Sequence, residues 1–175
     1  MKLESRKVLN RSLQEVYDLV KNDLAKLVPY LPNVAKIEVK SSTPKGDGKT
    51  ELVNNWYAKV DLPSMLTKFI KPEIFSWKDV AIWDDNTYSV SYELTSFLVG
   101  DLFEAKGVNS FKVVGEGKTE LTVSCSIHIY PEKVPGVPRL LAGSVRPMIE
   151  ALIEKIIGPN LASLGDGLEK YFQGK

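Results

Sequence analysis

The sequence contains one cysteine and one histidine among 175 residues, and this scarcity excludes several kinds of site. Because Cys125 is the sole cysteine, no disulfide can form within the chain. No second thiol and no histidine cluster provides the ligand spacing of a zinc site, so we expect no metal and no cofactor. Phosphate-binding loops, dinucleotide fingerprints and the Gly-x-Ser-x-Gly nucleophile motif are also missing from the sequence.

An excess of one charge and long hydrophobic runs are missing as well. Lys plus Arg number 23 and Asp plus Glu number 22, so the formal net charge of +1 gives no reason to expect nucleic acid as a partner. The first ten residues are polar, and no apolar run approaches the roughly 20 residues of a membrane span. We therefore expect a soluble, cytoplasmic protein.

What is present is a regular succession of elements, beginning with a strand at Leu3–Leu9. Ser12 and Glu15 have the spacing of a capping box, and apolar residues follow at helical spacing. This pattern predicts a helix, or a broken pair of helices, from Ser12 to Val28.

From Val34 the period of hydrophobicity changes to two, and turn residues divide the pattern into three hairpins. The six predicted strands are Val34–Ser42, Thr50–Val60, Glu73–Trp83, Thr87–Phe97, Leu102–Val114 and Thr119–Tyr130.

The last third of the chain predicts a long amphipathic helix over Val145–Ile157, with apolar residues in steps of three and four. Gly158 and Pro159 should kink or break it, which leaves residues 158–175 as a kinked helical extension. The whole chain, residues 1–175, suits one domain.

A meander of strands must have its apolar face covered, and the last helix is the only predicted element long enough to cover it. We therefore predict an α+β fold in which a curved antiparallel sheet of about seven strands wraps around the C-terminal helix. One helix cannot fill such a concavity, so an apolar cavity should remain between helix and sheet.

The element order, the helix beginning Ser12-Leu13-Gln14-Glu15-Val16, the Tyr30-Leu31-Pro32-Asn33-Val34 stop and the closing amphipathic helix carry a resemblance. In layout the chain resembles the START-like helix-grip (SRPBCC, birch-pollen-allergen-like) superfamily, and within it the polyketide cyclase and coenzyme-Q-binding branch. The resemblance implies binding of a hydrophobic ligand, sometimes lipid transport and occasionally catalysis.

Strand alternation and the helical stripe predict which side chains face the cavity. The candidate ligand-binding residues are Asn54, Trp56, Tyr88, Tyr92, Asn109, Phe111, Cys125, Met148 and Leu152. The polar members either orient a ligand or hydrogen-bond inside the protein, and the aromatic members are either cavity wall or core. The strand that carries Trp77 and Trp83 has a broken alternation, and its inward face is not defined by the sequence.

No catalytic residue is assigned. His128 falls on the outward face of its strand, Cys125 is expected to be a small buried hydrophobic residue, and Asp84-Asp85 is expected at a solvated turn.

Three functions remain open. The first is a carrier or sensor of a small hydrophobic ligand such as a lipid or isoprenoid. In that case Pro63–Ile70 is either an entrance flap, with Lys68 and Lys71 making transient membrane contact, or a helix that plugs the end of the sheet.

The second function is that of a cyclase-like or aromatase-like enzyme, in which the shape of the cavity folds the substrate and Tyr88, Tyr92 or Asn109 make polar contacts to it. The third is an interaction module whose C-terminal tail docks on a partner or a second copy, through exposed Leu164, Leu168 and Phe172.

Overall fold

The computed structural model describes residues 2–59, 76–96, 103–130, 133, 143, 147, 151 and 163–174. The predicted Pro63–Ile70 segment and most of the predicted helix Val145–Ile157, with Met148 and Leu152, lie outside the described residues.

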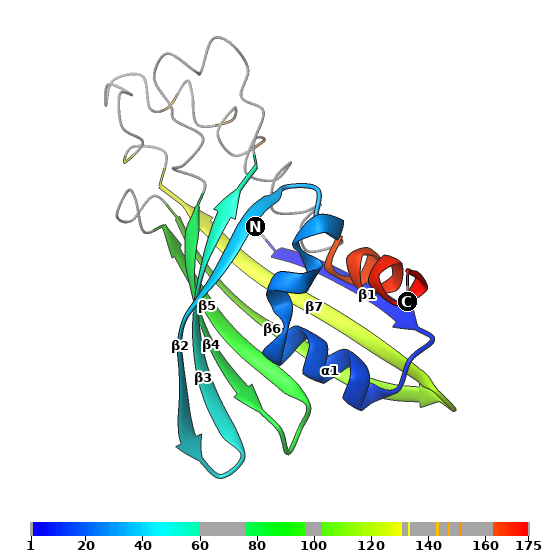
Figure 1. Ribbon diagram of the computed structural model, residues 1–175. Coiled ribbons are helices and arrows are strands. Elements are labelled where there is room, and N and C mark those ends of the chain that lie inside the picture. The colour runs from blue at the N-terminus through cyan, green and yellow to red at the C-terminus, as the bar shows by residue number, and fades with distance from the viewer. Residues whose placement is uncertain are drawn as a thin grey trace.

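The described chain is built on one antiparallel sheet of seven strands in the order β1-β7-β6-β5-β4-β3-β2. The strands are β1 Lys2–Leu9, β2 Val34–Gly46, β3 Lys49–Ala58, β4 Trp77–Asp84, β5 Ser89–Ser96, β6 Phe103–Gly115 and β7 Lys118–Ile129. The three predicted hairpins and the first strand are confirmed, and Figure 1 shows the strong curvature of the sheet. The hairpins follow one another around the sheet, and β1 closes one edge by pairing with β7.

Helix α1 (Leu13–Asn22) and the 3-10 helix η1 (Leu24–Tyr30) lie on one side of the sheet (Figure 1). The predicted capping box is present, because the Glu15 backbone N–H donates to Ser12 Oγ and the Ser12 N–H donates back to Glu15 Oε2 at 3.1 Å. Of the two alternatives left open by the sequence, the broken pair of helices is the one that forms. Val16, Leu19 and Val20 bury the inner face of α1.

The C-terminal helical residues, 163–173, lie beside β1 and η1 (Figure 1). Leu168 is fully buried, and the rings of Tyr171 and Tyr30 meet edge to face at 6.0 Å. Lys7 of β1 forms ion pairs with Asp166 at 2.9 Å and Glu169 at 2.7 Å. Residues 163–174 therefore pack against the rest of the same chain, and Leu168 is directed into the core.

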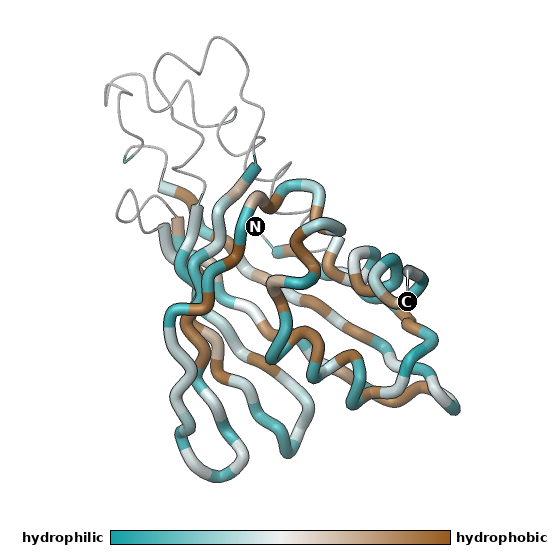
Figure 2. The backbone as a smooth tube through the Cα atoms, in the orientation of Figure 1, coloured by the Kyte–Doolittle hydropathy of each residue, from teal (hydrophilic) through white to brown (hydrophobic). Residues whose placement is uncertain are grey.

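The two faces of the sheet differ in polarity as the alternation predicts, and Figure 2 shows hydrophobic and hydrophilic segments alternating along the strands. In β7 every second side chain is buried, as period-two alternation requires: Leu121, Val123, Cys125, Ile127 and Ile129. Val113 lies by alternation on the same face of β6 as Asn109 and Phe111, but it is 66% exposed. It lies beside a register shift between Val113 and Gly115, where the ladder becomes irregular near the hairpin end.

Candidate functional site

An apolar cavity of about 130 Å³ lies between the α1–η1 segment and the inner face of the sheet. Its volume is close to that of the roughly 150 Å³ apolar cavity that accommodates a benzene ring in a well-studied engineered protein. Aliphatic side chains contribute much of its wall, including Val20, Leu24, Leu31, Leu52, Ala81, Val90 and Leu164. Space for one small ring is therefore present, and its walls favour an apolar occupant.

All three tryptophans of the sequence line this cavity. Trp56 and Trp77 are stacked with ring centroids 5.5 Å apart and an interplanar angle of 16°. Trp83 packs further along β4 against Phe111. Flat aromatic surfaces of this kind suit a ligand that carries a ring of its own.

The inward face of β4, which the sequence left undefined, consists of Trp77, Asp79, Ala81 and Trp83. The alternation is regular once the strand begins at Trp77, so there is no bulge within β4. The predicted strand began at Glu73, and including those earlier residues made the pattern look broken. The consequence is that an acidic side chain points into the cavity.

Asp79 is a carboxylate that is only 8% exposed inside this apolar wall. Its Oδ2 accepts hydrogen bonds from Asn54 Nδ2 at 3.4 Å and from Trp56 Nε1 at 3.3 Å. Its Oδ1 is buried and has no hydrogen-bond partner among the described residues. Loss of hydration raises the pKa of Asp79 to about 6, although the two hydrogen bonds oppose the rise.

A second polar position lies farther along the cavity. Trp83 pairs with Val90 across β4 and β5, and Val90 pairs with Asn109 across β5 and β6. Trp83 Nε1 and Asn109 Oδ1 are both buried without a partner in the described chain. Trp83 lies four positions after Asp79 along the strand, which corresponds to about 13 Å at roughly 3.3 Å per residue. The cavity therefore has an unpaired acceptor towards one end and an unpaired donor and acceptor towards the other.

Four of the residues predicted from the sequence line the cavity: Asn54, Trp56, Tyr92 and Asn109. The side chain of Tyr92 extends from β5 across the sheet towards β7, where its hydroxyl donates to the Ser124 carbonyl at 3.0 Å. It passes directly over Gly107, where an added Cβ would lie 2.3 Å from the tyrosine Cζ and from the Ser124 oxygen. Tyr92 therefore lines the cavity, and its hydroxyl group is already hydrogen-bonded within the protein.

Three other predicted residues, Tyr88, Phe111 and Cys125, are described by the structure and lie outside the cavity lining. Phe111 and Tyr88 pack edge to face on Tyr17 beneath α1, with centroid distances of 5.3 and 5.1 Å. Cys125 is buried in the sheet, and burial raises the pKa of its thiol, which keeps it protonated. Cys125, Phe111 and Tyr88 are therefore not among the described residues that line the cavity.

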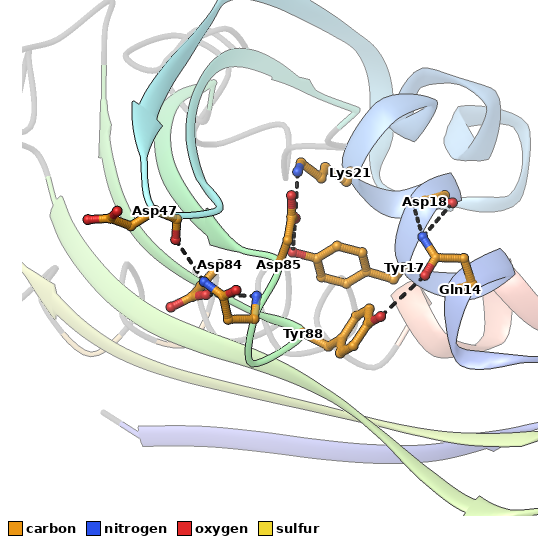
Figure 3. Close-up of polar contacts among 9 residues, drawn as sticks. Gln14, Tyr17, Asp18, Lys21, Asp47, Asp84, Asp85 and Tyr88 are labelled. Atoms are coloured by element: carbon orange, nitrogen blue, oxygen red, sulfur yellow. Dashed lines mark hydrogen bonds and ion pairs between the residues drawn. The ribbon is translucent and has the colours of Figure 1, made fainter.

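The turn at Asp84-Asp85, expected to be solvated, holds α1 against the sheet (Figure 3). Asp85 Oδ1 accepts from the buried Tyr17 hydroxyl at 2.8 Å and from Lys21 Nζ at 2.6 Å. Lys21 also lowers the pKa of Asp85. In the same turn Tyr88 adopts a positive φ of 48° and directs its hydroxyl to Gln14 of α1. This network fixes the helix that forms one wall of the cavity.

Elsewhere in the described residues, His128 is exposed on the outer face, as the alternation predicts. The same part of the chain contains no group of three or more metal-ligating His, Cys, Asp or Glu side chains. None of its helices combines the length and hydrophobicity needed to cross a membrane.

Solved structures share this architecture over nearly the full length of the chain. The protein TTHA0849 from Thermus thermophilus superposes with a TM-score of 0.65 at 19% identity, covering 98% of this chain and 99% of its own. The ZhuI aromatase/cyclase from Streptomyces sp. R1128 gives 0.64 at 15% identity, with 98% and 95% coverage. A START superfamily protein from Mycobacterium smegmatis gives 0.56 at 13% identity, with 97% and 98% coverage.

These matches define the class of architecture: the chain has the START-like helix-grip fold, an α+β arrangement of a seven-stranded antiparallel sheet and a C-terminal helix. The fold predicted from the resemblance is confirmed. At identities below 20% the likeness concerns the fold and not the ligand or the chemistry. No family model and no curated protein matches the sequence.

Proposed function

We propose that the protein binds a small, mainly apolar molecule that contains a ring, in the cavity between α1–η1 and the sheet. The observation that carries this proposal is a cavity of about 130 Å³ lined by three tryptophans together with buried, unpaired polar atoms. A core serving packing alone would normally fill such a space and pair its polar atoms. The helix-grip fold is typical of proteins that bind hydrophobic ligands, which supports the same function.

Two measurements test this function. Native mass spectrometry of gently purified protein should detect a bound apolar compound. Titration of emptied protein with toluene should change the tryptophan fluorescence in a saturable manner, because every tryptophan lines the cavity.

A pair of variants locates the binding. Ala81→Leu adds apolar volume inside the cavity and should weaken toluene binding, whereas Ser126→Leu adds a similar volume on the exposed face of β7 and should not. A protein that carries no apolar compound and gives no saturable response would not have this function.

A cyclase-like enzyme is the second candidate, and Asp79 is the observation that favours it. A carboxyl group with a pKa of about 6 can both accept and return a proton near neutral pH. In an aldol-type ring closure Asp79 would take a proton from a carbon flanked by carbonyls, that carbon would bond to a ketone carbon, and Asp79 would return the proton to the ketone oxygen. Loss of the new hydroxyl group together with a second proton from the same attacking carbon would then release water. A linear polyketone followed by mass spectrometry for loss of water is the test. Asp79→Asn should abolish any acceleration while ring binding persists.

The third possibility, docking of the tail on a partner, receives little support from the described residues. Leu168 is fully buried and Leu164 and Phe172 are partly buried against the core of the same chain.

A further inference from the structure

We infer that Asp79 selects the ligand: the cavity accepts a ring that carries a hydroxyl group and rejects a ring that carries a carboxylate. This inference rests on the proposed ligand-binding function and specifies the chemical class of the ligand.

The first ground is the unpaired oxygen. Asp79 Oδ2 is engaged by Asn54 and Trp56, whereas Oδ1 is buried with no partner among the described residues. A buried acceptor without a donor is costly, and a ligand that supplies the donor removes that cost. A hydroxyl group on an otherwise apolar ring can donate to Oδ1 without bringing a second charge into the cavity.

The second ground is the charge of the lining. Among the described lining residues only Asp79 and Lys21 carry a formal charge. Lys21 Nζ is already paired at 2.6 Å with Asp85, which is not a lining residue, so its charge is largely neutralised before a ligand anion could use it. A ligand carboxylate beside Asp79 would meet a like charge in a site of low polarity, where repulsion is strong.

The third ground is the other end of the cavity. The unpaired atoms there are the Asn109 oxygen, an acceptor, and Trp83 Nε1, a donor. These neutral groups can pair with a second hydroxyl or a carbonyl oxygen, and neither supplies a cation for a carboxylate. Both ends of the described cavity are therefore suited to neutral, oxygen-bearing groups.

The test compares benzene, phenol and benzoate, three ligands built on the same ring, at pH 8. Binding is followed by the indole ¹⁵N–¹H signals of the three tryptophans, since all three line the cavity. Phenol should bind at least about tenfold more tightly than benzene, because a hydrogen bond to a charged acceptor has about that value. Benzoate should cause no saturable shift.

Two variants assign the discrimination to Asp79. Asp79→Asn removes the negative charge, so the preference for phenol over benzene should fall to that of a neutral hydrogen bond, and benzoate should bind detectably but still more weakly than phenol. Asp84→Asn makes the same change on the same strand outside the cavity lining and should leave the order of the three ligands unchanged.

The outcomes separate the two proposals. If benzene and phenol bind equally, or benzoate binds the natural protein as well as phenol does, the assignment to Asp79 is overturned while ring binding stands. If none of the three shifts the indole signals, both fail. The comparison within the natural protein decides the matter even if Asp79→Asn does not fold.

Discussion

Trp56 and Asp79 form a partly buried donor–acceptor pair, in which the indole Nε1–H of β3 donates to a carboxylate oxygen of β4 over 3.3 Å. Their positions are out of direct register, because Trp56 pairs with Trp77 and Asn54 pairs with Asp79. Two successive inward residues of β3, Asn54 and Trp56, thus converge on one carboxylate oxygen and leave the other buried without a hydrogen-bond partner among the described residues. This arrangement underlies the first two predictions.

The first prediction concerns stability and pH. The folded-state pKa of Asp79, about 6, lies above its ordinary value of 3.8, so the folded protein binds the proton more tightly than the unfolded chain. The contribution of Asp79 to stability is therefore fully present below about pH 4 and is lost as the pH rises through 6. The loss is about 3 kcal/mol, from roughly two pKa units at about 1.4 kcal/mol each. Urea unfolding of the natural protein and Asp79→Asn between pH 4 and 8 measures it. A difference between the two proteins that stays constant with pH would contradict the raised pKa.

The second prediction is spectroscopic. The Trp56 indole N–H is bonded to Asp79, so its ¹⁵N–¹H signal should titrate with a midpoint near pH 6. The change should vanish in Asp79→Asn and persist in Asp84→Asn, in which the cavity is unaltered. A Trp56 signal that is unchanged between pH 4.5 and 8 in the natural protein would show that the pair does not exist in solution.

The third prediction concerns the close contact between Tyr92 and Gly107. Gly107→Ala would place a Cβ 2.3 Å from Tyr92 and from the Ser124 carbonyl, so the tyrosine must move. We expect a loss of about 1–3 kcal/mol in the free energy of unfolding, the usual cost of overpacking. Gly115→Ala is the matched control, because its nearest neighbour is the flexible Lys118 side chain at 3.6 Å. Equal stability of the two variants would show that Tyr92 does not lie over Gly107.

The fourth prediction concerns the attachment of α1. Tyr17→Phe removes the donor to Asp85 from a fully buried ring and should cost about 1 kcal/mol, the net value of a typical hydrogen bond. The same change at Tyr57, whose hydroxyl bonds Glu38 on a more exposed part of the sheet, should cost less. Thermal unfolding monitored by circular dichroism compares the two. A larger loss at Tyr57 would contradict the role given to the Tyr17–Asp85 contact.

The strands, the start of α1 and the buried face of β7 could be predicted from the sequence because they depend on local residue patterns. Period-two alternation located the strands, Ser12 and Glu15 marked the start of α1, and the alternation of β7 identified its buried face. Among the candidate site residues, alternation placed Asn54, Trp56, Tyr92 and Asn109 on the inner face, where they line the cavity.

Asp79 could not be predicted in the same way. An acidic residue in a strand of undefined phase is normally assigned to the solvent face, because burial of a charge is unfavourable. Its burial depends on donors from another strand, and the pairing that brings Asn54 and Trp56 to it is a long-range property of the fold. The same holds for Asp85, whose partners Tyr17 and Lys21 lie 68 and 64 residues away in sequence.

The central claim is that a small ring compound occupies the space bounded by the three tryptophans and Asp79. A crystal of the emptied protein soaked in iodobenzene tests it most directly, because iodine gives an anomalous signal that locates the ring. The account predicts a peak inside the cavity, near Trp77 and Ala81. An interior with no iodine, and with side chains filling the space beside Trp77, Ala81 and Trp83, would contradict it.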